Sequence, residues 1–165
     1  MGLFGFRKTS GCAPVEVEFT REELDAIALD REMVLAGVRI TDPKAERGVT
    51  AQSLANYSDG LVSDTEYGNY SDPEISEMLD RAWKAKLKAY AVHNLPAFLF
   101  QAAVQLECIG QNDQAINTYR SFLDAQRGFR PDRIDELCLA QMGEKFLDSQ
   151  RMVGVALERI ELLTQ

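Results

Sequence analysis

Histidine and cysteine carry much of protein catalysis and metal binding, and this chain has one histidine and three cysteines. A single histidine, His93, excludes the two-histidine HExxH zinc site. His93 follows a predicted helix, where the helix dipole favours an imidazolium, so we expect a structural role for it. Cys12, Cys108 and Cys138 are too few and too far apart for a zinc motif or a disulfide framework. Apolar neighbours around Cys108 and Cys138 predict buried thiols.

Other catalytic patterns are absent from the sequence. The chain contains neither a glycine-rich phosphate loop nor a GxSxG elbow. The carboxylates between Glu22 and Glu32 have the spacing of a solvated helix face. A pair of carboxylates that meet only in the fold stays open. The sequence therefore predicts a protein that is not an enzyme and that has no catalytic residue, cofactor or metal site.

Three cations, Arg81, Lys84 and Lys88, share one face of a predicted helix and form the only compact basic feature. They could meet an acidic partner or a phosphate, although such a stripe is typical of the wet side of a helix. The formal net charge of the chain is −8, from 26 acidic and 18 basic residues. This charge opposes attraction to nucleic-acid phosphates, so we expect a protein partner and no nucleic acid.

The composition predicts one globular domain. The chain has 165 residues, of which 45% are hydrophobic and 27% charged. No apolar run approaches the roughly 18 residues of a membrane span, so we expect no stable membrane insertion. Residues 1–14 are glycine-rich and irregular, and they predict a flexible arm. The low number of cysteines favours a reducing compartment and a cytoplasmic location.

A first helix is predicted from the capping box that Thr20 and Glu23 form, and it should end near Arg39. Residues 41–72 are polar and interrupted by glycines, which predicts a mobile polar segment. The tetrapeptide Asn-Tyr-Ser-Asp occurs twice in this segment, at 56–59 and at 69–72. Because tyrosines alternate with serine and aspartate there, a partner-binding or modified segment is the alternative interpretation.

Helical periodicity returns at residue 72, with Asp72 as the expected N-cap, and continues to about Val92. Large apolar residues form one stripe of this helix and small ones an adjoining stripe, so we expect it to be the central helix. Four more helical segments follow, at 98–109, 113–126, 132–147 and 149–163. Short connections make neighbouring helices antiparallel. Residues 15–165 are thus predicted to be one all-α domain of antiparallel helical hairpins.

The segment from Leu99 to Phe122 has a distinctive pattern of small and aromatic residues. Ala103 and Ala115 lie twelve positions apart, Gly110 falls between them, and Tyr119 follows. This pattern resembles one tetratricopeptide repeat, a helix–turn–helix unit of about 34 residues, over about 96–129. The match is degenerate, since Leu99 replaces the usual tryptophan and Phe122 the usual alanine.

A second hairpin is predicted at about 134–163. At an offset of 38 residues Leu99 corresponds to Leu137 and Tyr119 to Leu157, whereas Gly110 corresponds to Asp148. Two amphipathic hairpins share part of this pattern through periodicity alone. A tetratricopeptide-like array and an irregular helical bundle therefore both stay open.

The resemblance implies a non-enzymatic protein–protein interaction or adaptor module that holds a peptide or helix in a groove. The groove would be lined by the first helix of each pair, which makes Gln101, Gln105 and Gln141 candidate partner contacts. The basic stripe of Arg81, Lys84 and Lys88 is a separate candidate contact. One alternative is a small acidic cytoplasmic chaperone or secretion-associated adaptor, for which a homodimer is an option. Another is a ligand-binding or enzymatic helical bundle with residues 41–72 as its lid.

Overall fold

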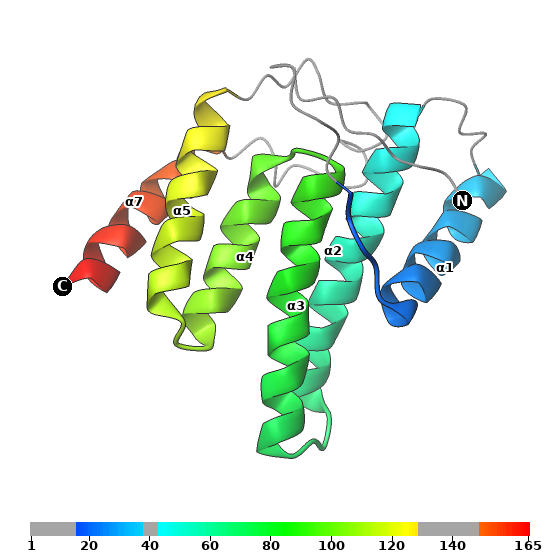
Figure 1. Cartoon of the computed structure of the whole chain (residues 1–165), viewed down its shortest axis with the longest axis horizontal. Coiled ribbons are helices and arrows are strands. Elements are labelled where there is room, and N and C mark those ends of the chain that lie inside the picture. The colour runs from blue at the N-terminus through cyan, green and yellow to red at the C-terminus, as the bar shows by residue number, and fades with distance from the viewer. Residues whose placement is uncertain (1–15, 38–42, 129–148) are drawn as a thin grey trace.

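The computed structural model describes residues 16–37, 43–128 and 149–165. These ranges fold into helices without any strand, which confirms the predicted all-α class. The helices are α1 (Arg21–Gly37), α2 (Pro43–Tyr67), α3 (Asp72–Val92), α4 (Pro96–Cys108), α5 (Asn112–Arg127) and α7 (Ser149–Thr164). From α1 to α5 each helix packs on the next one along the chain, and α7 packs on α5 and α4 (Figure 1).

Capping boxes begin two of the helices. At α1 the Thr20 amide donates to the Glu23 carboxylate at 2.8 Å, and the Glu23 amide donates to the Thr20 hydroxyl at 3.2 Å, as predicted. At α3 the N-cap is Ser71 and not Asp72. The Glu74 carboxylate accepts hydrogen bonds from the Ser71 amide (2.8 Å) and hydroxyl (2.7 Å), and these two bonds lower the pKa of Glu74. Glu74 lies three residues after Ser71, which is the spacing of a capping box.

The prediction of a mobile polar segment at 41–72 is wrong for residues 43–67, which form α2. This helix packs between α1 and α3, so it cannot serve as a lid without disrupting the core. Its buried apolar side chains are few, and two of them are alanine: Val49, Ala51, Leu54, Ala55 and Leu61. Between them lie two buried serines whose hydroxyls donate to backbone carbonyls, Ser53 to Val49 at 2.8 Å and Ser58 to Ala82 at 2.7 Å. Serine and alanine thus form a buried face that a hydrophobicity pattern does not reveal.

The core consists of two main apolar clusters on either side of α3. The first joins α2, α3 and the start of α4: Ala51, Leu54, Ala55, Ala89, Val92, Leu95 and Phe98. The second joins α4, α5 and α7: Leu99, Ala103, Leu106, Ala115, Tyr119, Phe122 and Ala156. Tyr90 of α3 packs against both clusters, and Trp83 and Leu87 pack against the second. This arrangement agrees with the predicted central position of α3.

The predicted hairpin between residues 96 and 127 is formed by α4 and α5. Gly110 makes the turn with a φ of +77°, a conformation that favours glycine. Ala103 and Ala115 are fully buried between the two helices, where small side chains allow close approach. The Phe100 ring meets the rings of Tyr119 and Phe122 edge-on, with centroids 5.8 and 5.4 Å apart. Residues 1–14 and 132–147, where a flexible arm and another helix were predicted, lie outside the described residues.

Candidate functional site

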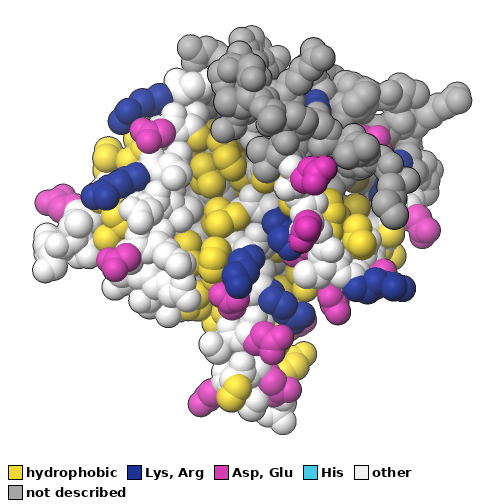
Figure 2. Space-filling view, viewed as in Figure 1, with side chains coloured by type: hydrophobic (Ala, Val, Ile, Leu, Met, Phe, Trp, Pro, Cys, Tyr) yellow, Lys and Arg dark blue, Asp and Glu magenta, His cyan; other side chains and the backbone are white. Residues whose placement is uncertain are grey.

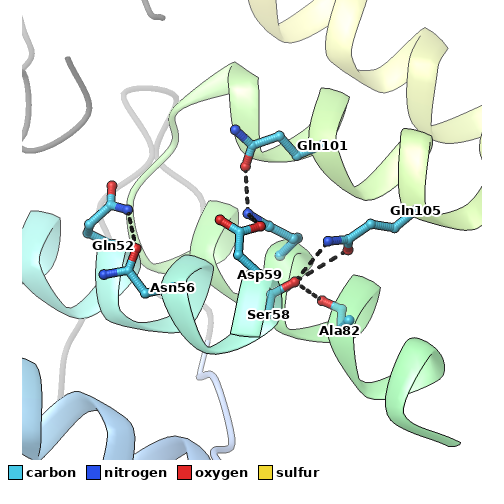
Figure 3. Close-up of polar contacts among 8 residues, drawn as sticks. Gln52, Asn56, Ser58, Asp59, Ala82, Gln101 and Gln105 are labelled. Atoms are coloured by element: carbon cyan, nitrogen blue, oxygen red, sulfur yellow. Dashed lines mark hydrogen bonds and ion pairs between the residues drawn. The ribbon is translucent and has the colours of Figure 1, made fainter. Parts of the chain in front are cut away.

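Gln101 and Gln105, two of the predicted partner contacts, lie in a polar cluster between α2, α3 and α4 (Figure 3). We call this cluster the polar seam; its side chains are Ser58, Asp59, Lys86, Gln101 and Gln105. The Lys86 ammonium lies 2.8 Å from the Asp59 carboxylate and donates to the Gln101 amide oxygen at 2.8 Å. The Gln105 amide nitrogen donates to the Ser58 hydroxyl at 3.0 Å.

Burial in the polar seam is uneven. The side chain of Lys86 is 1% exposed, whereas that of its ion-pair partner Asp59 is 65% exposed. A buried ammonium needs a charged or polar partner, because desolvation of an unpaired charge is costly. The seam therefore ties three helices together, and the two glutamines contribute their polar atoms to that tie. Gln141, the third predicted contact, lies outside the described residues.

Sequence reasoning missed Lys86, although its position carried a signal. It follows Ala82 by four residues and precedes Ala89 by three, so it lies on the buried small-residue stripe of α3. A lysine on an apolar face predicts a charged or polar partner for its ammonium.

In the basic stripe, Lys84 and Lys88 make different contacts, and the buried Nε atom of Arg81 has no hydrogen-bond partner in the described part of the chain. Lys84 pairs with Asp80 at 2.6 Å, and both side chains are exposed. Lys88 donates to both carboxylate oxygens of Glu23 on α1, at 3.0 and 2.8 Å. The stripe is therefore partly neutralised within the molecule.

Tyr57, in the first Asn-Tyr-Ser-Asp copy, is half-buried. Burial raises the pKa of its phenol, the Arg81 guanidinium opposes this effect, and Glu23 and Glu22 add to it. The second copy, residues 69–72, is exposed at the turn between α2 and α3.

The α2–α3 hairpin projects beyond the other helices (Figure 1), since α2 and α3 have 25 and 21 residues, and α4 and α5 only 13 and 16. We call its end, residues 62–77, the acidic tip. It contains five carboxylates, all exposed, and no Lys, Arg or His: Asp64, Glu66, Asp72, Glu74 and Glu77. Figure 2 shows acidic side chains at the lower projection, with hydrophobic ones among them.

Two tyrosines belong to the acidic tip. Tyr67 is 86% exposed, and Tyr70 is also exposed. A Cβ atom at Gly68 would lie 2.2 Å from Cε2 of Tyr70 and 2.6 Å from the Asp64 carbonyl oxygen. The Tyr70 ring thus lies against the Gly68 backbone, where no larger residue fits unless the turn shifts.

A third polar cluster joins α4, α5 and α7. The Tyr119 hydroxyl donates to the Glu107 carboxylate at 3.0 Å, and Arg159 of α7 pairs with the other oxygen of that carboxylate. Burial, followed by the neighbouring Cys108, raises the pKa of Tyr119 to about 12. These contacts hold α7 on the hairpin.

The cysteines and the histidine were the other candidate groups in the sequence. Cys108 is exposed, because it is the last residue of α4, so the predicted burial is wrong; Cys138 lies outside the described residues. His93 is the C-cap of α3. Within the described ranges, no group of three or more His, Cys, Asp or Glu side chains could hold a metal ion. A search of the same ranges finds no helix with the length and apolar character to cross a membrane.

Comparison with known proteins gives no match to a family model, to a curated protein or to a solved structure.

Proposed function

We propose that this protein is a non-enzymatic protein–protein interaction or adaptor module, and that its partner binds at the acidic tip. The observation that carries the proposal is the pair of exposed tyrosines, Tyr67 and Tyr70, among five exposed carboxylates at the end of a projecting hairpin. Such an adaptor would work in the cytoplasm.

Tyrosine is well suited to this role. Its ring adds a large contact area at a low cost in conformational entropy, and tyrosine is enriched among the residues that dominate binding energy. Tyr70 is already positioned by its contact with Gly68. A side chain held in place before binding loses less entropy when the partner arrives.

The charge of the acidic tip defines the partner. Five carboxylates without a cation give residues 62–77 a formal charge of −5. Such a field accelerates the approach of a basic surface and disfavours an acidic one. We therefore expect a basic protein surface or a basic peptide.

The acidic tip supports binding better than Gln101 and Gln105 do. Both glutamines use side-chain polar atoms within the polar seam. A partner that bound to them would have to replace contacts that join α2, α3 and α4. At the tip, no such internal contact has to be broken for Tyr67 to bind.

Photo-cross-linking in cells tests the proposal. A photoreactive phenylalanine at position 67 should cross-link to a basic protein. The matched control is the same group at Leu162, an exposed residue of α7. Position 162 should give no cross-link to that protein. A partner that cross-links at 162 and not at 67 would contradict the proposal, as would the absence of any cross-linked protein at 67.

A further inference from the structure

Residues 21–33 of helix α1 contact the rest of the molecule through only a few partly buried apolar side chains. Among these residues the only buried side chain is a carboxylate, that of Glu23, which is 4% exposed. Large apolar side chains of the same helix face outwards; Leu29 is 61% and Met33 71% exposed. Apolar burial is the main source of helix stability in proteins, so residues 21–33 gain little of it.

Three polar contacts of the described side chains join residues 21–33 to α2 and α3. Lys88 of α3 holds both oxygens of Glu23, at 3.0 and 2.8 Å. The other two are the hydrogen bond from Asn56 to Asp30 at 3.1 Å and the ion pair of Arg31 with Glu46 at 2.7 Å. The hydrogen bond is exposed and the Arg31 side chain is 52% exposed. Since exposed pairs contribute little, the Glu23–Lys88 pair is the most buried and the strongest of these three ties.

Beneath α1 lies the first apolar cluster. Only three side chains of residues 16–33 pack against it, and all three are partly buried: Val17, Phe19 and Ile27. These side chains cover part of the cluster, whose members include Ala51 and Leu54 of α2 and Ala89 of α3. If residues 16–33 moved away, this apolar surface would meet water, with Lys88 beside it.

We propose that residues 16–33 form a releasable cover over the surface between α2 and α3, held closed by the Glu23–Lys88 pair. The cover opens as a unit while α2 to α5 stay folded. Opening breaks few apolar contacts, whereas unfolding of α3 would break both core clusters. The cover therefore controls when this apolar surface is exposed, and this property does not depend on binding at the acidic tip.

Native-state hydrogen exchange of the full chain at increasing low concentrations of denaturant tests the cover. In the unaltered chain the amides of α1 should exchange through an opening that depends on denaturant less than global unfolding does, because release of residues 16–33 exposes less surface than unfolding of the whole chain. The amides of α3 and α4 should exchange through an opening with the strong dependence of global unfolding. The same strong dependence for α1 would overturn the proposal.

Glu23→Gln tests the tie, because glutamine preserves the capping box and removes the charge. It should accelerate exchange of the α1 amides by at least about tenfold, equivalent to about 1.4 kcal/mol, and leave α4 and α5 within about twofold. Lys88→Met should accelerate exchange of the α1 amides by a similar factor. In the double variant, Lys88→Met should add little to the acceleration that Glu23→Gln already causes. The control Arg31→Gln, which breaks the more exposed pair, should change exchange by less than about threefold.

Two outcomes would overturn the role of the tie: equal acceleration of every helix by Glu23→Gln, or an equal effect of Arg31→Gln on α1. Even if a variant fails to fold, the denaturant dependence in the unaltered chain decides whether residues 16–33 open separately from the other helices.

Discussion

At the level of single residues, Lys86 has a buried ammonium whose desolvation must be offset by its polar partners. Its partner Asp59 regains water easily because that side chain is 65% exposed. Lys86→Met should therefore change the free energy of unfolding by less than about 1 kcal/mol, since an apolar side chain replaces the buried charge. Asp59→Asn should cost more, about 2 kcal/mol, because it removes the carboxylate from a buried ammonium.

Chemical denaturation of the two variants measures this difference. Asp64→Asn, at the exposed tip, is the matched control for Asp59→Asn and should have little effect. A larger loss from Lys86→Met than from Asp59→Asn would contradict the assignment of Lys86 as the desolvated partner.

Tyr119 predicts a fall in stability at high pH. Its pKa in the folded chain, about 12, exceeds the ordinary value of 10.0. Between these values the unfolded chain binds fewer protons than the folded chain, so the free energy of unfolding falls as pH rises. The contribution is complete below a pH of about 10 and is lost as the pH rises through about 12.

Urea denaturation across this pH range, with Tyr119→Phe as the comparison, tests the assignment. The variant loses the hydrogen bond to Glu107, a cost of about 1 kcal/mol, but its stability should fall less steeply with pH. Parallel pH profiles for the two proteins would show that Tyr119 titrates normally.

Ala115 tests the packing of the α4–α5 hairpin. It is fully buried in the second apolar cluster, so Ala115→Trp should destabilise the protein by roughly 1–3 kcal/mol or more through overpacking. Asn117→Trp is the control, because Asn117 is an exposed residue of the same helix. Thermal denaturation measures both variants, and equal melting temperatures would contradict the assigned hairpin packing.

At the scale of helices, the sequence predicted α3, α4 and α5 well and α2 poorly. The first group has large apolar residues at helical spacing, with proline or glycine near the ends. In α2 the buried face contains Ser53 and Ser58, which a hydrophobicity pattern counts as exposed. Their hydroxyls are satisfied by backbone carbonyls, and one of these carbonyls belongs to α3, so the burial of α2 depends on tertiary contacts.

Two glycines in different elements should respond oppositely to alanine. Gly60 lies inside α2 with open space around it, so Gly60→Ala should stabilise the protein by about 0.5–1 kcal/mol. Gly110 has a φ of +77° in the α4–α5 turn, so Gly110→Ala should destabilise it by about 1 kcal/mol. Denaturant midpoints measure both changes, and the same sign for the two would contradict the assigned helix or the assigned turn.

At the scale of the whole molecule, the row of helices brings together residues that no local pattern connects. Glu23 meets Lys88 across 65 positions, and Glu107 meets Arg159 across 52. The sequence shows tyrosines among serine and aspartate at 56–72. It does not show that Tyr67 and Tyr70 lie at a projecting end and that Tyr57 does not. Exposure of Tyr67 follows from the lengths of α2 and α3 relative to their neighbours, which is a property of the assembled fold.

The most direct test of the acidic tip as the binding surface is the affinity of the cross-linked partner for purified variants, measured by calorimetry at several salt concentrations. Tyr67→Ala combined with Asp64→Lys should weaken binding by at least about tenfold and reduce its salt dependence, because one aromatic contact and one favourable charge are lost. Leu162→Ala, on α7, should leave both quantities unchanged. Unchanged affinity and salt dependence in the tip variant would contradict the assignment of the acidic tip as the binding surface.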